Sequence, residues 1–123
     1  MAHVKLYNQD GDEKAKEIQQ KLAKKFGKLP EVFQAMGRNG QFLETALKLG
    51  EVAGTGLDPK TRELIAVAVS AVNGCEYCLS AHSAIARSVG ATDADITAAI
   101  EVAAMMSFYN NFNKSLGLNV DIK

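Results

Sequence analysis

Two cysteines and a histidine lie close together in one short segment, GCEYCLSAH at residues 74–82. On a helix, Cys75, Cys78 and His82 are three and four positions apart, so their side chains share one face. Cysteines at this spacing can reach the roughly 5.5–6 Å between Cα atoms that is usual for a disulfide. Unpaired N–H groups in the first helical turn would stabilise a thiolate, and His82, one turn beyond Cys78, can take the thiol proton. The segment therefore predicts redox chemistry at a pair of thiols.

An acid on the preceding predicted helix is the candidate partner of this histidine. Glu63 lies within the predicted helix 59–72, and the short connection at residues 73–74 favours antiparallel packing of the two helices. At about 1.5 Å per residue, Glu63 lies roughly 15 Å from that turn and His82 roughly 12 Å. The order along the hairpin is then Glu63, His82 and the two cysteines, which is the order that a proton relay requires. Spacing alone does not establish that the two helix faces meet.

Each of these residues also has a simpler interpretation. Cysteines in an intracellular helix can serve as small apolar side chains, and Glu63 can be an acid near a helix start that complements the helix dipole. A structural zinc site is the chemical alternative, because Cys75, Cys78 and His82 supply three of the four ligands that zinc requires. The fourth ligand would be Glu63 or His3, and three ligands on one helix strain tetrahedral geometry. We therefore rank zinc below redox chemistry.

The elements that must position these residues are predicted to be helices. Apolar residues recur every four positions from Ile18 to Phe26, as on a helix with one buried stripe. Asp58-Pro59 is a typical helix start, with the aspartate as N-cap and the proline at the first position. The predicted helices cover residues 11–26, 30–37, 41–53, 59–72, 75–89 and 92 to about 108.

Two of these helices have distinctive sequences. The segment RELIAVAVSAV at residues 62–72 is apolar nearly all round after its first two residues. Such a helix lies centrally in a core or in a subunit interface. Thr92 with Asp95, three positions on, approximates a capping box at the start of the last helix.

Length and composition agree with one small helical domain. The chain has 123 residues, enough for one core, and 47% hydrophobic residues, which is ordinary for a globular protein. There is no strong strand-plus-hairpin signal. We predict an all-α fold, a compact single domain of five to six helices over residues 1–123, with a core at about 30–117 and an N-terminal helix within 1–29. The paired cysteines would lie at the N-terminus of a helix.

Charge and hydropathy exclude several classes of function. The 14 basic and 14 acidic residues give zero formal net charge, so the strong electrostatic footprint of a nucleic-acid-binding protein is absent. No apolar run reaches the roughly 18 residues that span a bilayer. The N-terminal sequence MAHVKLYNQD has no plausible signal-cleavage pattern. We expect a cytoplasmic protein without nucleic-acid or membrane partners, in a compartment where thiols are kept reduced.

Taken together, the four residues resemble a known family. Glu63, eleven residues, Cys75-x-x-Cys78, three residues and His82 form a pattern similar to that of the alkylhydroperoxidase D family, within the carboxymuconolactone decarboxylase superfamily. The Ala/Val-rich helix before the cysteines and the segment FYNNFN at residues 108–113 also look like that family. The resemblance covers roughly residues 30–117, and the four-residue pattern is its most specific part.

This resemblance implies an all-helical fold assembled as a homotrimer or homohexamer. It implies a thiol peroxidase or disulfide reductase that uses no metal and no other cofactor. By position, Cys78 would attack the peroxide oxygen and become a sulfenic acid, Cys75 would resolve it as a disulfide, and Glu63 and His82 would carry the proton relay. A dithiol or lipoyl-type electron donor would then reduce the disulfide.

One residue departs from the family pattern. Well-studied peroxidase members often have a histidine immediately before the second cysteine, where this chain has Tyr77. A shorter or weaker relay is therefore expected. Decarboxylase members generally lack the paired cysteines, which disfavours the lactone reaction. Two further classes stay open, namely a binding or regulatory protein that uses the disulfide as a switch, and a structural zinc-binding helical protein.

Overall fold

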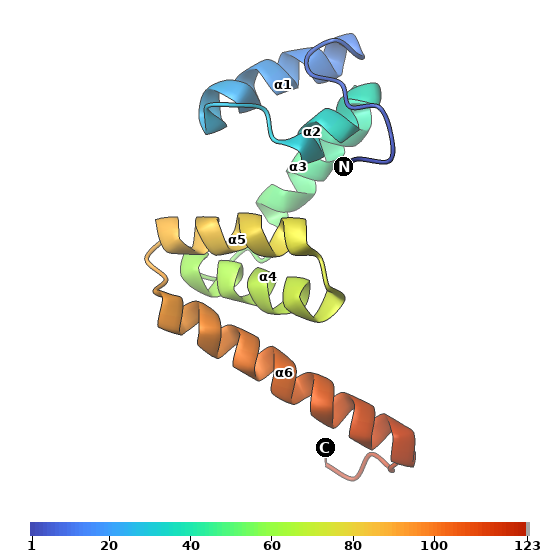
Figure 1. Ribbon diagram of the computed structural model, residues 1–123, viewed down its shortest axis with the longest axis vertical. Coiled ribbons are helices and arrows are strands. Elements are labelled where there is room, and N and C mark those ends of the chain that lie inside the picture. The colour runs from blue at the N-terminus through green and yellow to red at the C-terminus, as the bar shows by residue number, and fades with distance from the viewer. Residues whose placement is uncertain (123) are drawn as a thin grey trace. The chain divides into compact units, whose positions relative to one another are not determined.

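The computed structural model describes residues 1–122, and within them every regular element is a helix (Figure 1). The elements are α1 (Glu13–Phe26), α2 (Glu31–Ala35), the short 3₁₀ helix η1 (Met36–Arg38), α3 (Gly40–Val52), α4 (Pro59–Asn73), α5 (Glu76–Ser88) and α6 (Asp93–Leu116). The predicted all-α class with five to six helices is confirmed for these residues. The chain divides into two compact units, Met1–Thr55 and a second that begins at Gly56. One domain over residues 1–123 stays a prediction.

In the first unit, α1 packs against α3, and η1 contacts both helices. The side chain of Gln19 is fully buried and ties the N-terminal segment to α1 and α2. Its Nε2 donates to the carbonyl oxygens of Tyr7 and Phe33, both at 2.8 Å, and its Oε1 accepts from the Gln9 N–H at 2.9 Å. The buried apolar residues around it are Ala15, Leu22, Leu29 and Leu43.

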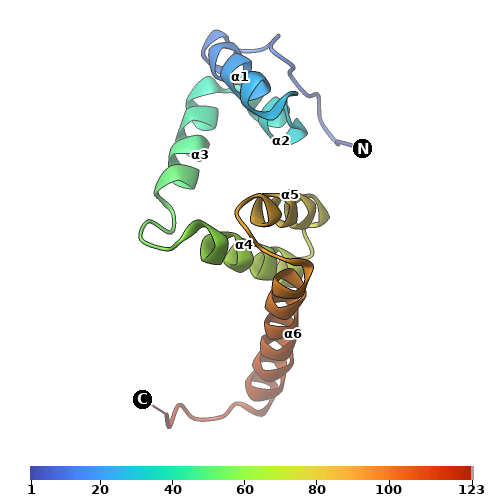
Figure 2. The same ribbon diagram turned by 90° about the vertical axis from the view of Figure 1, so that its left-hand side faces the viewer.

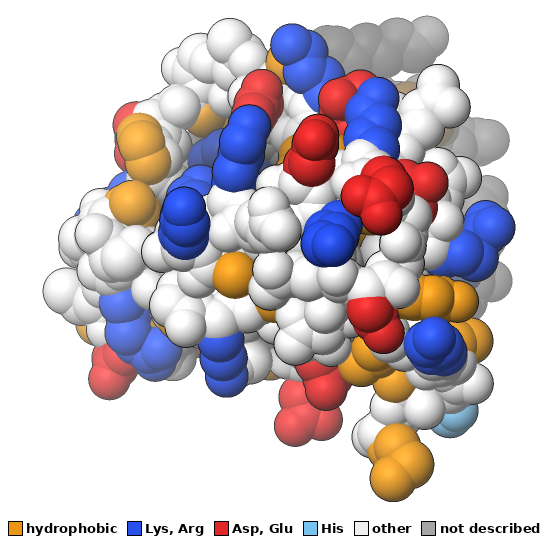
Figure 3. Space-filling view, turned by 90° about the horizontal axis from the view of Figure 1, so that it is seen from above, with side chains coloured by type: hydrophobic (Ala, Val, Ile, Leu, Met, Phe, Trp, Pro, Cys, Tyr) orange, Lys and Arg blue, Asp and Glu red, His pale blue; other side chains and the backbone are white. Residues whose placement is uncertain are grey.

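The surface over α1 carries charges of both signs. Figure 3 shows Lys and Arg side chains interspersed with Asp and Glu on this face. Such a face presents no large field of a single sign. Within residues 1–122, no helix is both long enough and apolar enough to cross a membrane.

The second unit is built on an antiparallel hairpin of α4 and α5. These helices lie side by side in both ribbon views (Figures 1 and 2), and α6 packs against α4. Asp58 caps α4 and Pro59 takes its first position, as predicted. The predicted capping box of Thr92 and Asp95 is present at the start of α6. The buried apolar residues of this unit are Val67, Ala86, Ala91 and Ile96.

Helix α4 is buried on one face only. Val67 is fully buried, whereas Ile65, Val69 and Val72 are about half exposed, at 48%, 53% and 58%. The core of the unit therefore accounts for one side of this apolar helix. The apolar side chains on its other side remain about half exposed.

Several helix ends differ from the prediction. Helix α6 continues to Leu116 instead of ending near residue 108, because no glycine or proline interrupts it before Gly117, which ends it with a φ of 62°. Pro30 precedes α2 as its N-cap, and the predicted helix 30–37 is split into α2 and η1. Cys75 is the N-cap of α5 and not a member of its first turn.

The start of α4 depends on the ionised side chain of Asp58. The Thr61 hydroxyl donates to Oδ2 at 2.6 Å, and the Thr61 N–H donates to Oδ1 at 3.0 Å. These hydrogen bonds hold the pKa of Asp58 below its ordinary value. A carboxyl group with a lower pKa in the folded state stabilises that state above its unfolded pKa, and this contribution is lost as the pH falls through the folded pKa.

We expect Asp58→Asn to flatten the dependence of stability on pH. The asparagine keeps an oxygen that can cap the helix, but it removes the titrating group. Denaturant unfolding between about pH 5 and pH 2 should show a smaller loss of stability on acidification than in the wild-type chain. Asp10→Asn, at an exposed position before α1, is the matched control. An unchanged acid slope in Asp58→Asn would contradict the assignment.

Candidate active site

The two cysteines lie at the turn between α4 and α5. Gly74 ends α4 with a φ of 71°, a conformation that a residue with a Cβ adopts only with strain. The Cys75 N–H then donates to the carbonyl oxygen of Ser70 at 3.0 Å, and the chain enters α5. Cys75 and Cys78 form a disulfide, with Cα atoms 5.3 Å apart. The pairing that the spacing allowed is therefore present.

A backbone hydrogen bond also reaches the first sulfur. The Cys78 N–H donates to Cys75 Sγ at 3.2 Å, so the side chain of Cys75 caps α5. Helix N-termini attract negative charge, because their first N–H groups lack partners within the helix. The same bond would stabilise a Cys75 thiolate after reduction of the disulfide.

His82 and Glu63 meet across the hairpin. His82 Nδ1 lies 2.6 Å from Glu63 Oε2, and α5 supplies the histidine while α4 supplies the acid. The faces that spacing alone could not align are in contact. A neutral imidazole that donates from Nδ1 to a carboxylate keeps Nε2 as its acceptor. His82 follows Cys78 by one helical turn on α5, and its side chain is 34% exposed.

Glu63 lies deeper in α4 than a helix-start acid would. The first turn of α4 contains no acidic residue, and Glu63 lies in the next turn. Its side chain is only 6% exposed, although a surface acid that complements a helix dipole needs no burial. A buried carboxylate is stable only when other groups compensate its charge.

A residue that the sequence analysis missed supplies part of that compensation. Arg62 Nη1 lies 2.9 Å from Glu63 Oε1, so the arginine and the histidine contact different oxygens of one carboxylate. The available signal was a basic residue next to an acid at the beginning of an otherwise apolar helix. Adjacent positions on a helix do not normally face each other, which is why the pair was not expected.

The surroundings of the disulfide include a small hollow. Its volume is about 230 Å³, and it lies against Cys75 at the corner between α4 and α5. Tyr77, between the two cysteines, is 48% exposed. The residues that line the hollow are Ser70, Ala71, Gly74, Cys75, Glu76 and Leu79.

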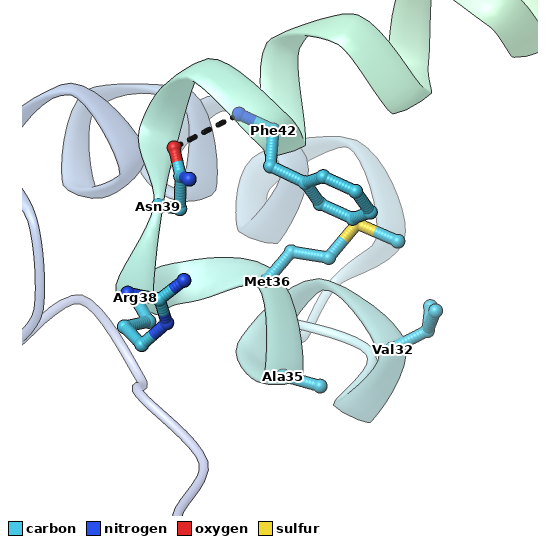
Figure 4. Close-up of a pocket in the computed structure, with 6 residues that line it drawn as sticks. All are labelled: Val32, Ala35, Met36, Arg38, Asn39 and Phe42. Atoms are coloured by element: carbon cyan, nitrogen blue, oxygen red, sulfur yellow. Dashed lines mark hydrogen bonds between the residues drawn. The ribbon is translucent and has the colours of Figure 1, made fainter.

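A larger cavity, of about 430 Å³, belongs to the first unit (Figure 4). The Phe42 ring and the Met36 side chain lie next to each other there, and the Phe42 N–H donates to Asn39 Oδ1 at 3.1 Å. The lining contains no thiol, carboxylate or imidazole, so it lacks the groups of the predicted site despite its size. The lining residues are Val32, Ala35, Met36, Arg38, Asn39 and Phe42.

The arrangement of side chains bears on the zinc alternative. Within residues 1–122, no group of three or more His, Cys, Asp and Glu side chains is arranged to hold a metal ion. Zinc binds cysteine as a thiolate, whereas the two sulfurs here are bonded to each other. His3, the other proposed ligand, is an exposed residue of the first unit.

Comparison with known proteins points to the same family as the sequence pattern. The sequence model described as "Carboxymuconolactone decarboxylase family" matches residues 41–119. The alkyl hydroperoxide reductase AhpD of Azorhizobium caulinodans is 37% identical over 65 residues, which are 53% of this chain and 36% of that protein. "Uncharacterized protein 4 in cox locus" of Paracoccus denitrificans is 39% identical over 99 residues, covering 73% of this chain and 89% of that protein. The match thus spans only about a third of the AhpD relative.

A solved structure is similar over nearly the whole chain. The crystal structure of the alkylhydroperoxidase AhpD core from Rhodospirillum rubrum superposes with a TM-score of 0.81 at 26% identity. The match covers 98% of this chain and 95% of that one. The predicted resemblance to the alkylhydroperoxidase D-like proteins is therefore confirmed.

Proposed function

Because this chain belongs to the carboxymuconolactone decarboxylase family, we propose that its cysteine pair makes it a thiol-dependent peroxidase that reduces hydroperoxides. One observation carries the proposal. The Cys75–Cys78 disulfide lies one helical turn from His82, whose Nδ1 contacts the buried Glu63 at 2.6 Å. Thiol oxidation with proton transfer requires two cysteines that can form a disulfide and an acid–base pair that moves the proton.

In the proposed oxidative step, His82 accepts the thiol proton of Cys78, and Glu63 stabilises the imidazolium that forms. The Cys78 thiolate attacks one oxygen of the hydroperoxide, a sulfur–oxygen bond forms, and the oxygen–oxygen bond breaks. Cys78 becomes a sulfenic acid, and the alkoxide leaving group takes the proton from His82 to become an alcohol. Tyr77 supplies no imidazole between the cysteines, so this relay contains one histidine only.

The resolving step uses the first cysteine. A Cys75 thiolate, stabilised by the Cys78 N–H that lies 3.2 Å from its sulfur, attacks the sulfur of Cys78. The disulfide forms, the sulfur–oxygen bond breaks, and the hydroxide combines with the proton that the Cys75 thiol had released to solvent and leaves as water. The net reaction oxidises two thiols to a disulfide and reduces the hydroperoxide to an alcohol and water.

Turnover requires a dithiol or lipoyl-type electron donor, which the cytoplasm would supply. We assign its attack to Cys75, because this residue borders the hollow of about 230 Å³. Cys78 then leaves as a thiolate beside His82, and the second donor thiol displaces Cys75. The donor departs as a disulfide, and both cysteines are thiols again.

A homo-oligomer, a trimer or hexamer by the family resemblance, is the proposed assembly. An apolar stripe along α6 supports it, with side chains that are between 43% and 62% exposed. Phe108 stacks with Phe112 at 6.1 Å between ring centres, which gives the stripe a continuous aromatic surface. Large exposed apolar patches are uncommon on monomers, so other copies of the chain are the proposed cover. The stripe consists of Val102, Met105, Met106, Phe108, Tyr109, Phe112 and Leu116.

Serine variants of the two cysteines test the proposed reaction. The wild-type chain with a dithiol donor should consume a hydroperoxide repeatedly, and Cys78→Ser should abolish turnover. Cys75→Ser should give a single burst, followed by a sulfenic acid on Cys78 that dimedone labels. Continued turnover by Cys78→Ser would contradict the assignment of the attacking thiol. A wild-type disulfide that forms and breaks without peroxide turnover would favour the redox-switch function.

The acid of the proposed relay can be tested by Glu63→Gln, which keeps the shape of the side chain. Peroxide turnover should fall by roughly 10²–10⁴-fold, the usual contribution of general acid–base catalysis. The unfolding midpoint, measured on the same samples, separates this effect from a loss of folded protein. Glu101→Gln, an exposed acid on α6, is the matched control and should leave turnover unchanged. Turnover within about twofold of wild type in Glu63→Gln would remove Glu63 from the relay.

The proposed assembly can be tested by light scattering at micromolar concentration. The wild-type chain should give a mass that is a multiple of its 13.2 kDa. Phe108→Ser combined with Phe112→Ser should reduce that mass, because two aromatic side chains are removed from the α6 stripe. A wild-type mass near 13.2 kDa would contradict the assembly.

A further inference from the structure

We propose that Arg62 is a positioning residue, which holds Glu63 in the orientation that presents Oε2 to His82. For its effect on peroxide turnover, this inference rests on the proposed function. For its effect on the state of the His82 ring, it depends only on the geometry of the hairpin.

The two carboxylate oxygens of Glu63 contact two different partners. Arg62 Nη1 lies 2.9 Å from Oε1, and His82 Nδ1 lies 2.6 Å from Oε2. A carboxylate that is held through one oxygen has its second oxygen fixed in direction as well. Since the side chain of Glu63 is only 6% exposed, water is a poor substitute for either partner.

The exposure and charge of the Arg62 side chain also suit this role. Its side chain is 35% exposed, so the guanidinium remains partly hydrated while one nitrogen contacts the buried acid. A guanidinium stays charged over the whole working pH range, so the buried carboxylate keeps a cationic partner. Lys60, the other cation near the start of α4, is paired with Asp95 at 2.9 Å, so it serves a different contact.

The consequence concerns which nitrogen of His82 carries the proton. An oriented Glu63 accepts from Nδ1–H and leaves Nε2 as the acceptor that the proton transfer from Cys78 requires. Without Arg62, Oε1 of Glu63 loses that partner and the carboxylate is free to turn. Both ring tautomers should then be populated.

Nitrogen NMR at about pH 8, where a free imidazole is neutral, shows directly which ring nitrogen of His82 carries the proton. The chain has 2 histidines, so His3, in the first unit, serves as an internal reference in the same spectrum. In the wild-type chain the Nδ1–H tautomer should dominate. Arg62→Gln should move the His82 signals toward those of Glu63→Gln, whereas Arg62→Lys, which retains a cation, should stay near wild type. Lys60→Gln, which removes the same charge from the same helix, is the matched control and should leave His82 unchanged.

Peroxide turnover provides the second measurement. Arg62→Gln should lose about tenfold or more, a usual result of removing an outer orienting partner, and Arg62→Lys should recover most of that loss. If Arg62→Gln does not fold, Arg62→Met, which keeps part of the apolar stem, repeats both measurements. A wild-type His82 spectrum in the folded Gln or Met variant, or an equal change in Lys60→Gln, overturns the inference. Absence of turnover in the wild-type chain overturns the proposed function instead, and the NMR comparison still decides the role of Arg62.

Discussion

The contact between Glu63 and His82 is the interaction on which the site depends. It is a polar contact that joins α4 to α5, and the buried cluster of these helices is otherwise apolar. A buried acid tolerates few arrangements, because every lone pair without a partner is costly away from water. The contact therefore fixes which faces of the two helices meet. The alignment of the two helices also sets the position of the cysteine pair on α5, one turn from His82.

The packing of the hairpin makes this contact geometrically accessible. Val67 on α4 and Ala86 on α5 are both fully buried in the same cluster. Leu64 and Leu79 pack against the same cluster, and the short side chains of Val67 and Ala86 limit the separation of the two helices. Larger residues at these positions would separate the two helices and lengthen the bond. The apolar sequence of α4 thus serves the site as well as the core.

Much of this site could be predicted from the sequence, because helical spacing is a local property. The positions of Cys78 and His82 on α5 follow from their separation alone, and the short turn at Asn73-Gly74 predicts an antiparallel partner, whereas Cys75 caps the helix instead of joining its first turn. The contact of Glu63 with His82 is a tertiary fact, which spacing permits but does not require. The pair of Arg62 with Glu63 was missed, because neighbouring side chains on a helix diverge unless a long one bends back. The end of α6 was predicted too early, near residue 108, because the helix continues until Gly117 without a glycine or proline to interrupt it.

The cap of α5 would couple the start of this helix to the redox state of the cysteine pair. Serine, threonine, aspartate and asparagine are the usual residues at a helix start, but α5 begins with a sulfur that is bonded to Cys78 and would become a thiol or thiolate on reduction. A thiolate is a better acceptor for the Cys78 N–H than a disulfide sulfur, so the helix start is held more firmly in the reduced protein. By thermodynamic linkage, that preference raises the reduction potential of the couple. A difference in capping of about 1 kcal/mol corresponds to about 20 mV. The first hydrogen bond of a helix thereby becomes one of the determinants of how readily the protein accepts electrons.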